Sequence, residues 1–538
     1  GYASMVLSSM TKVSDQDTDF YQRGVEPALR LSGNEYGSVQ VLLMAMPGKP
    51  LTGLDVDVTS LADGAGRPLA GASCKSFVVD FVRTAMPRKA PVYYADVLQP
   101  VHSGAFPEPR ALVPVWVDVY LPAGAPAGDY LSTVTLRPRG CAPTSVTVRV
   151  QATGLTLPKS ASLDTAFCFD RSWVKAFYGQ EPSKESMTGF WQFILDHRLE
   201  PMNLWGGAHD VGLDYLDYCA ENGKTMLFLS IRDIRKKEAS VREIVEKYRG
   251  RLRPIFFGHD EVLMSRKPGA LDNMMRDYRD AKELFPDIPR LNTARVDERL
   301  FGYVDIWCPL FQHIDIEANA ARAALGEKIW WYPTDYPLAP YANFNLDSPG
   351  IDPRVIPLMT WKLGLSGLLF WGLNREWPTN SPREFTHLSD AFIAERRMDW
   401  LNDELLTAMR AGELRWPAIP WLPYFRSVMN AKHVSVTNGG GNMMYPGADW
   451  QPLSSMRLKN LRDGMQDYEY LVMLRDNVAQ LKARGGHDDI VAASASLLAI
   501  DDAVVGSETS YSKDPVEYLA YRNKLIDMVL RSAAVLRK

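Results

Sequence analysis

The first part of the chain alternates apolar and polar residues in short runs. Examples are Ser38–Met44, Val113–Leu121 and Ser145–Gln151, which are separated by turns rich in Gly, Pro and Asp. Period-two alternation is typical of strands with one buried face, and many short strands between frequent turns favour a β-sandwich. We therefore predict an all-β domain over residues 1–158, which ends in the linker-like segment Leu155–Ser162.

From residue 159 onward, short apolar runs alternate with segments of helical periodicity. Helices are predicted at Lys184–His197, Val241–Arg251 and Leu271–Phe285. The predicted strands are Asp164–Phe169, Met202–Trp205, Thr225–Ile231, Pro254–Gly258, Arg290–Thr293, Val304–Leu310, Lys328–Tyr332 and Gly367–Leu373. Eight strands alternating with helices predict a (β/α)8 barrel of the TIM type over residues 159–455. A doubly wound open sheet is the alternative, but no GxGxxG or Walker loop follows any strand. Residues 456–538 carry long helical patterns, and we predict a C-terminal helical region packed on the barrel.

Composition and charge exclude several classes of partner. The chain has 538 residues, of which 46% are hydrophobic and 23% charged, and its formal net charge is −4. It therefore has no basic footprint for nucleic acid or an anionic membrane. No apolar run approaches the ~20 residues of a membrane-spanning helix. The N-terminal residues lack the layout of a signal peptide, which could have been removed. We expect a secreted or periplasmic protein, with the cytoplasm as the alternative.

The cysteines and histidines do not suggest a metal site. Five cysteines are scattered without CxxC spacing, and the eight histidines form no HExxH or HxH motif. We interpret the cysteines as mostly buried free thiols, and we predict no metal.

The most informative stretch is RLRPIFFGHDEVLM. A short apolar strand, the fourth of the barrel, is followed at once by His259, Asp260 and Glu261. Catalytic groups of such barrels lie at the carboxyl ends of the strands, so the position fits a catalytic carboxylate pair. The alternative is that Asp260 or Ser265 simply caps the next helix.

Aromatic residues favour a carbohydrate site. Of 14 tryptophans, 13 lie between residues 173 and 450. Flat rings beside polar groups suit the apolar faces of sugars; packing in the core or between helices and barrel is the better explanation of any single tryptophan, and the clustering at strand ends is what favours a sugar site. The candidate substrate-binding residues near predicted strand ends are His259, Asn203, Trp205, Trp307, Trp330, Trp331, Tyr332, Asp335, Trp371 and Asn374.

The tail segment Asn442–Leu474 carries a distinctive pattern: a YPG loop, then SxRL, then RDGxxDYEYL. It resembles the C-terminal part of a bacterial domain family formerly of unknown function. Further matches are Asn34–Gln40 (NEYGSVQ), Val115–Tyr130, Ile329–Tyr332 (IWWY), Met359–Gly367 and Leu369–Asn374 (LFWGLN). That family is similar to glycoside hydrolase family 123, the β-N-acetylgalactosaminidases, which have a β-sandwich before a (β/α)8 barrel.

The resemblance implies roles for the adjacent carboxylates. Glu261 would be the general acid/base, and Asp260 would orient the 2-acetamido group of the substrate, which attacks the anomeric carbon to give an oxazolinium ion. The product would retain its configuration, and no cofactor would be needed. Independently of the resemblance, neighbours in sequence are poorly placed to straddle a sugar as the paired carboxylates of ordinary retaining enzymes do. Pro often follows the family pair, whereas Val262 follows here.

The sequence supports three hypotheses. The leading one is a retaining β-hexosaminidase acting on β-linked N-acetylgalactosamine, in which Trp330, Trp371 and Tyr332 wall the sugar pocket and Asn374 binds a hydroxyl. The second is a glycosidase for another sugar, with Asp170, Asp335 or Glu376 as nucleophile. The third is a non-catalytic glycan-binding protein. The charged tail residues are expected to brace the C-terminal helices against the barrel.

Overall fold

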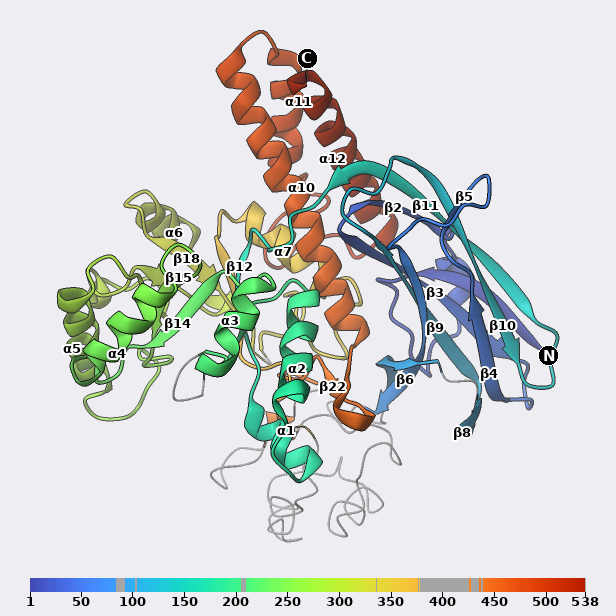
Figure 1. The fold of residues 1–538 in the computed structure, drawn as a ribbon, viewed down its shortest axis with the longest axis horizontal. Helices are drawn as coiled ribbons and strands as arrows, with labels where there is room; N and C mark the ends of the chain where they lie inside the picture. Colours follow the sequence, from blue (N-terminus) through green and yellow to red (C-terminus); the bar gives the residue numbers. More distant parts are fainter. Residues whose placement is uncertain are drawn as a thin grey trace.

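The computed structural model describes residues 1–83, 92–101, 104–204, 210–334, 336–375, 377, 425–426, 435–436 and 439–537. In these residues a β-sandwich, a parallel barrel and a set of C-terminal helices follow one another along the chain (Figure 1). The predicted fold class is confirmed.

The sandwich consists of two sheets. The first contains, in spatial order, β1 (Tyr2–Ser8), β3 (Glu35–Ala45), β9 (Leu112–Leu121), β6 (Ser73–Arg83) and β7 (Tyr93–Pro100). The second contains β2 (Ala28–Gly33), β11 (Thr144–Thr156), β10 (Gly128–Pro138), β4 (Leu51–Val58) and β8 (Gly104–Arg110), and β5 (Ala62–Asp63) pairs with β10. A 3-10 helix, η1 (Phe20–Arg23), lies between β1 and β2. Alternate valines of β9, from Val113 to Val119, pack into the core between the sheets, as the period-two pattern predicts.

The barrel is a nearly closed parallel sheet. Its strands, in spatial order, are β13 (Pro201–Met202), β12 (Asp164–Cys168), β19 (Gly367–Phe370), β18 (Lys328–Trp331), β17 (Ile306–Trp307), β16 (Arg290–Asn292), β15 (Arg253–Phe257) and β14 (Met226–Ser230). Most strands are shorter than predicted, because the continuous ladder ends where the chain turns into loops: the predicted Val304–Leu310, for example, forms a ladder only at Ile306 and Trp307, with one isolated bridge from Leu310 to Tyr332.

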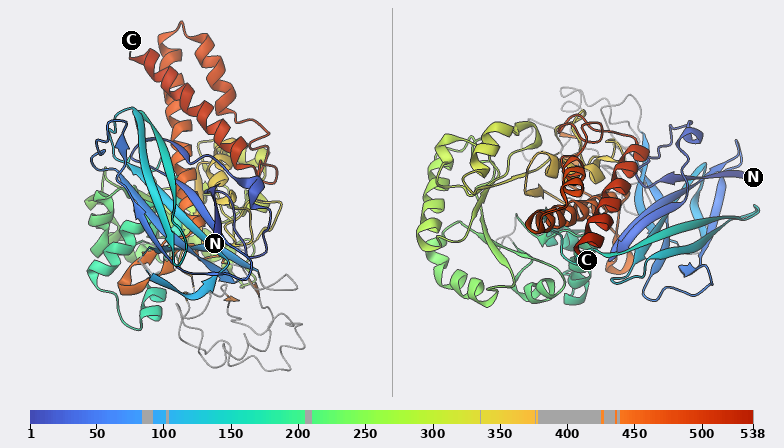
Figure 2. Two further views of the ribbon diagram at one scale, coloured as in Figure 1. Left: turned by 90° about the vertical axis from the view of Figure 1, so that its right-hand side faces the viewer. Right: turned by 90° about the horizontal axis from the view of Figure 1, so that it is seen from above.

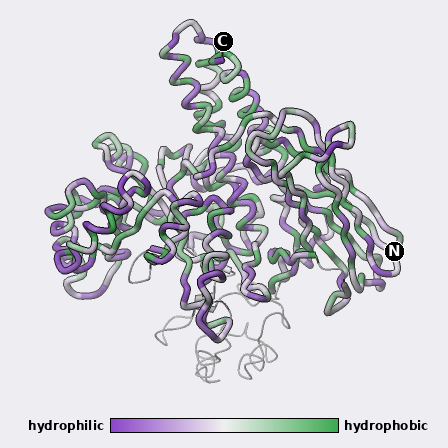
Figure 3. The backbone as a smooth tube through the Cα atoms, viewed as in Figure 1, coloured by the Kyte–Doolittle hydropathy of each residue, from purple (hydrophilic) through white to green (hydrophobic). Residues whose placement is uncertain are grey.

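Helices surround the barrel. They are α1 (Arg171–Tyr178), α2 (Lys184–Asp196), α3 (Leu213–Glu221), α4 (Ile234–Lys247), α5 (Ala270–Leu284), α6 (Ile316–Ala323) and α7 (Asp352–Lys362), with the 3-10 turns η2 (Glu298–Leu300) and η3 (Phe311–His313). The outer helices mix hydrophilic and hydrophobic turns (Figure 3), as expected for helices with one face on the sheet. Two short antiparallel pairs of strands, β20 (Phe425–Arg426) with β21 (Ser435–Val436) and β22 (Tyr445–Pro446) with β23 (Pro452–Leu453), precede the C-terminal helices; η5 (Ala448–Trp450) lies between β22 and β23.

The long helix α10 (Met456–Arg484) joins the two domains. Its first half lies between barrel and sandwich, and its second half projects beside α11 (Asp488–Leu498) and α12 (Pro515–Leu536) (Figures 1 and 2). Every residue of α10 up to Leu471 is buried. Gly464 allows close approach to α7, because a Cβ there would lie 2.4 Å from the carbonyl oxygen of Arg354.

Buried ion pairs fasten α10 on both sides. Arg462 binds Asp118 of the sandwich at 2.8 Å, and Arg457 binds Asp96 at 2.9 Å. Asp467 binds Arg354 of the barrel helix α7 at 2.8 Å and Arg522 of α12 at 2.5 Å. The RDGxxDYEYL motif therefore braces α10 against the barrel, as expected, and it also binds the sandwich, which was not predicted.

The remaining sequence expectations concern thiols, metals and membranes. All five cysteines are free; Cys168, Cys219 and Cys308 are buried. Within the described residues, no three His, Cys, Asp or Glu side chains gather to form a possible metal site. In the same part of the chain, no helix is both long and apolar enough to cross a membrane.

Candidate active site

Strand β15 ends in a tight turn that carries the two adjacent carboxylates. Gly258 packs closely here: a Cβ would lie 2.7 Å from Cγ2 of Ile231, at the end of the neighbouring strand β14. His259 and Glu261 both have left-handed backbones, with φ of 57° and 47°. Such conformations are costly for residues other than glycine and persist where surrounding contacts fix them. The turn is therefore held in place by its neighbours.

Thr293 is the contact that links the two carboxylates. It follows β16, the next strand of the barrel, and its hydroxyl donates to Oδ1 of Asp260 at 2.6 Å. The hydroxyl oxygen of Thr293 in turn accepts a hydrogen bond of 2.8 Å from the backbone N–H of Glu261. One side chain thus fixes both the Asp260 carboxyl and the backbone of Glu261.

The carboxyl of Glu261 reaches across the barrel mouth. Its Oε1 accepts a hydrogen bond of 2.6 Å from the hydroxyl of Tyr332, which follows β18. Burial, and then the negative charge of Glu261, hold the pKa of Tyr332 above its ordinary value, so the phenol remains a donor.

Helix α5 holds the turn from outside. Nε2 of His259 donates to Oδ2 of Asp277 at 2.7 Å, and burial lowers the pKa of His259 against the opposing effect of Asp277. The hydroxyl of Tyr278 binds the carbonyl oxygen of Gly258 at 3.0 Å. The Asn292 amide donates to the carbonyl oxygen of His259, also at 3.0 Å. His259 therefore faces the supporting helix.

Burial raises the pKa of Asp260 to about 6. The hydrogen bond from Thr293 and the positive charge of Arg232 oppose this effect, whereas the negative charge of Glu261 adds to it. Asp260 consequently changes its charge within the pH range in which many enzymes work.

Residues 202–474 match the sequence profile described as the glycoside hydrolase 123 catalytic domain. The chain belongs to glycoside hydrolase family 123. A solved structure of a family 123 glycoside hydrolase from Clostridium perfringens, described as revealing the details of glycolipid glycan hydrolysis, is similar over 100% of both chains, with 12% identity and a TM-score of 0.65. That likeness shows a shared fold. No curated protein matches the sequence.

Two other solved structures resemble parts of this family 123 chain more distantly. An FMN-binding β-glucuronidase from Facaelibacterium prausnitzii L2-6 shares 12% identity over 63% of this chain and 54% of its own, with a TM-score of 0.27. A family 39 glycoside hydrolase from Bacteroides cellulosilyticus WH2 shares 10% identity over 66% and 76%, also with a TM-score of 0.27. TM-scores this low do not show a shared fold.

Strand β18 turns the predicted aromatic residues of the family 123 chain in two directions. Trp330 and Tyr332 belong to the cluster inside the barrel, and Trp330 is fully buried there. Trp331 belongs to the outer cluster, where it stacks on Phe311 with ring centroids 3.8 Å apart. Trp307 is also in the outer cluster, and its indole donates to Glu327 at 2.5 Å. Trp307 and Trp331 therefore fill the layer between barrel and helices.

The other predicted site residues have varied surroundings. The Asn374 amide is engaged on both sides by the backbone of Asp170, at 2.8 and 2.9 Å, so it ties two loops of the barrel mouth together. Asp170 caps α1 through its side chain. Trp371 and Asn203 are half-buried after β19 and β13. Trp205, Asp335 and Glu376 lie outside the described residues.

Sequence reasoning missed the residues that hold the family 123 carboxylates in place: Thr293, Asp277, Tyr278 and Asn292. Thr293 and Asn292 stand at the end of a predicted strand, which was a usable signal. Asp277 and Tyr278 lie in the middle of a helix, and only the fold shows that they face the turn.

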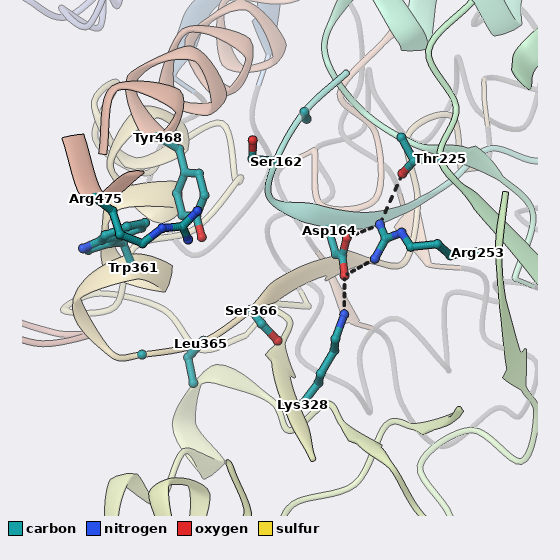
Figure 4. A pocket seen from close by; sticks show the side chains of 12 residues that line it. Ser162, Asp164, Thr225, Arg253, Lys328, Trp361, Leu365, Ser366, Tyr468 and Arg475 are labelled. Atoms are coloured by element: carbon teal, nitrogen blue, oxygen red, sulfur yellow. Dashed lines mark hydrogen bonds and ion pairs between the residues drawn. The ribbon is translucent and has the colours of Figure 1, made fainter. Parts of the chain in front are cut away.

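A separate pocket of about 620 Å³ lies at the opposite end of the barrel (Figure 4). Asp164, Arg253 and Lys328 stand there at the starts of their strands, and Asp164 binds both cations, at 2.5 and 3.2 Å. Tyr468 and Arg475 of α10 close one side. Residues at this end of a (β/α)8 barrel commonly stabilise the fold and take no part in catalysis, and the ion pairs of Asp164 with Arg253 and Lys328 fit that role.

Proposed function

We propose that the chain is a retaining β-N-acetylhexosaminidase that cleaves β-linked N-acetylgalactosamine by substrate-assisted catalysis. The observation that carries the proposal is the arrangement of Asp260 and Glu261. Each carboxyl has one oxygen engaged by a neighbouring hydroxyl. No described residue donates a hydrogen bond to Oδ2 of Asp260 or to Oε2 of Glu261. These two oxygens are therefore available to a substrate.

The adjacency of the pair favours division of labour. A two-carboxylate retaining enzyme needs its groups ~5–5.5 Å apart on opposite sides of the sugar, and substrate-assisted enzymes are the exception to that arrangement. Asp260 and Glu261 leave the same turn, held by the same threonine, and so approach a sugar from one side. From there one carboxyl can meet the glycosidic oxygen while the other meets the 2-acetamido group.

In the proposed first step, Glu261 in its protonated form donates to the leaving oxygen. The hydrogen bond from Tyr332 to Oε1 leaves Oε2 to carry that proton. Asp260 in its ionised form accepts the acetamido N–H, which makes the acetamido carbonyl oxygen a better nucleophile toward the anomeric carbon. The bond to the leaving oxygen breaks as the oxazolinium ring closes.

In the second step, Glu261 as carboxylate removes a proton from water. The water attacks the anomeric carbon on the face that the leaving group vacated, and the oxazolinium ring opens to restore the acetamido group. Two inversions at the anomeric carbon give net retention. Asp260 stabilises the positive charge of the intermediate throughout, which requires it to be ionised.

The choice of N-acetylgalactosamine as the sugar is supported by the family to which the chain belongs, because the resemblance to family 123 implies that sugar. The similar Clostridium perfringens structure concerns glycolipid glycans. We propose a glycan ending in β-linked N-acetylgalactosamine as substrate, and an extracytoplasmic site of action where such glycans are displayed. Trp371, Tyr332 and Asn203 remain the candidates for contacts with the terminal sugar.

The test is hydrolysis of 4-nitrophenyl N-acetyl-β-galactosaminide by wild type and by Glu261→Gln, followed by NMR of the first-formed anomer. We expect hydrolysis by the wild type with release of the β-anomer, and a loss of at least about 10²-fold in Glu261→Gln. A thiazoline analogue of the oxazolinium ion should inhibit the wild type. Equal rates in both proteins, or release of the α-anomer, would refute the proposal. Failure of the thiazoline with activity intact would favour a glycosidase that uses a second carboxylate.

A further inference from the structure

The pocket of about 620 Å³ at the starts of the barrel strands lies at the end of the barrel away from Asp260 and Glu261 (Figure 4). We propose that it is a second, non-catalytic site that binds a saccharide. The inference goes beyond the proposed function, because the site uses neither Asp260 nor Glu261 and does not depend on their mechanism.

Tyr468 of α10 is the residue that points to a ligand. Its side chain lines the pocket, and the residue is only 8% exposed. Among the residues that the structure describes, none forms a hydrogen bond with the Tyr468 hydroxyl. Buried hydroxyls are nearly always hydrogen-bonded, so this one is left to the molecule that occupies the pocket.

One wall of the pocket is aromatic. The ring of Trp361, from α7, meets two side chains of α10: the ring of Tyr468, with centroids 5.4 Å apart, and the guanidinium of Arg475, at 5.8 Å from the Trp361 centroid. Leu365 lines the pocket as well. Aromatic and apolar side chains of this kind can pack against the C–H faces of a sugar ring.

The other wall is polar. Asp164 binds Arg253 at 2.5 Å and Lys328 at 3.2 Å, and in Figure 4 these three side chains stand on the side opposite Trp361 and Tyr468. About half of the Arg253 and Lys328 side chains remains exposed, so both keep donors for a ligand, and Asp164 supplies acceptors. Sugar hydroxyls both donate and accept hydrogen bonds.

The balance of charge favours a neutral ligand over an anion. Asp164 compensates part of the charge of Arg253 and Lys328, and Asp476 pairs with Arg475 at 2.8 Å. A sugar has apolar faces and a polar edge, which match an aromatic wall opposite a polar one. The pocket volume lies within the range typical of small-molecule sites. The family of the chain acts on glycosides, which makes a saccharide the fitting occupant.

The experiment locates bound saccharide by hydrogen–deuterium exchange in Glu261→Gln, which should turn over the probe slowly. The probe is a neutral tetrasaccharide ending in β-linked N-acetylgalactosamine, and inorganic sulfate at the same concentration tests for a simple anion site. We expect the tetrasaccharide, but not sulfate, to slow exchange in residues 161–164 and 361–366 beside the pocket. The proposed function predicts separate protection of the catalytic turn, residues 258–261.

Tyr468→Phe removes only the unpaired hydroxyl. It should raise the tetrasaccharide concentration that half-protects the pocket segments about fivefold, because a neutral hydrogen bond contributes about 1 kcal/mol. Arg475→Ala should raise it about tenfold, since a charged donor contributes more. The matched control is Arg484→Ala, which removes another exposed arginine of α10 outside the pocket and should change nothing. With Glu261 intact, all three variants should keep the wild-type kcat/KM for 4-nitrophenyl N-acetyl-β-galactosaminide, because the pocket is not catalytic.

Protection of the catalytic turn alone would overturn the second site and leave the proposed function standing. Equal protection of the pocket by sulfate, or pocket protection that Tyr468→Phe and Arg475→Ala both leave unchanged, would also overturn it. Protection of the pocket without the turn would support the second site and count against the proposed substrate.

Discussion

Thr293 and Asp260 are joined by a hydrogen bond of 2.6 Å in which the threonine hydroxyl is the donor. Because the same hydroxyl oxygen accepts the backbone N–H of Glu261, the end of one barrel strand sets the geometry of the turn after its neighbour. The hydrogen bond also lowers the pKa of Asp260 against the larger effect of burial, which raises it. Thr293 therefore connects the position of the two carboxylates to the ionisation of Asp260.

Replacing Thr293 by valine should move the acid limb of the activity profile to higher pH. Without the donated hydrogen bond the pKa of Asp260 rises above about 6, and the ionised form that the proposed mechanism needs to hold the acetamido group appears only at higher pH. A hydrogen bond contributing about 1 kcal/mol corresponds to a shift of about 0.5–1 pH unit. The measurement is kcat/KM of Thr293→Val between pH 4 and 8.

The conservative variant Thr293→Ser is the control, because it keeps the hydroxyl. Its acid limb should stay near that of the wild type. If Thr293→Val merely lowered activity by the same factor at every pH, the threonine would be acting on the turn geometry alone.

Asp260→Asn should lose activity and gain stability at neutral pH. Because its folded pKa of about 6 exceeds the ordinary 3.8, the folded state binds more protons between these values, and stability falls as pH rises through that window. Removing the charge should raise the free energy of unfolding at pH 8 by about 1–2 kcal/mol, given 1.36 kcal/mol per pKa unit and partial solvent screening. Urea unfolding at pH 8 and pH 4 checks this, and a gain of equal size at both pH values would contradict it.

Periodicity was sufficient to predict the barrel and the sandwich. The fold needs only that apolar runs recur with the right period and that helices separate them, so β12 to β19 could be recognised strand by strand. The strand ends could not be placed as well, because loop residues such as Val304 and Leu310 are apolar for reasons of tertiary packing. Both are buried beyond the continuous ladder, and Leu310 makes only an isolated bridge to Tyr332.

Residues of the candidate site could be recognised where residue type and strand end coincide. Asp260 and Glu261 met both conditions. The tryptophans met them too, but a single strand turns successive side chains to opposite faces, so Trp330 points into the barrel while Trp331 packs outward. To predict which tryptophan points into the barrel, one must know which face of the strand lines the barrel interior. In a strand that is buried on both faces, the sequence pattern does not distinguish the two faces.

Tyr332→Phe should slow catalysis more than it weakens binding. The phenol donates to Oε1 of Glu261, and in the proposed mechanism this contact matters most when Glu261 becomes a carboxylate after giving up its proton. Loss of a hydrogen bond to a charged group predicts a fall in kcat of about 10- to 100-fold with a smaller change in KM. Steady-state kinetics on the aryl glycoside separates the two constants, and a change confined to KM would show that Tyr332 serves ground-state binding.

Asp467→Ala should destabilise the protein by about 3–5 kcal/mol. The carboxylate of Asp467 lies between Arg354 and Arg522 and accepts the hydroxyl of Tyr518 at 2.9 Å, all in buried surroundings. Its removal leaves two buried guanidinium groups short of a counter-charge at the junction of α7, α10 and α12. The thermal unfolding midpoint of the variant, measured beside that of the wild type, reports the loss.

Asp527→Ala is the matched control, because Asp527 also pairs with an arginine, Arg30, but is 65% exposed. Exposed pairs contribute about 0–1 kcal/mol, so its midpoint should stay close to that of the wild type. The kcat of folded Asp467→Ala should equal that of the wild type. Next to Asp467 on α10, Tyr468 lines the pocket at the starts of the barrel strands, and this is the end of the barrel away from Glu261. Equal destabilisation by the two variants would mean that the network around α10 contributes no more than a surface ion pair, whereas a fall in kcat would place the brace in contact with the catalytic end of the barrel.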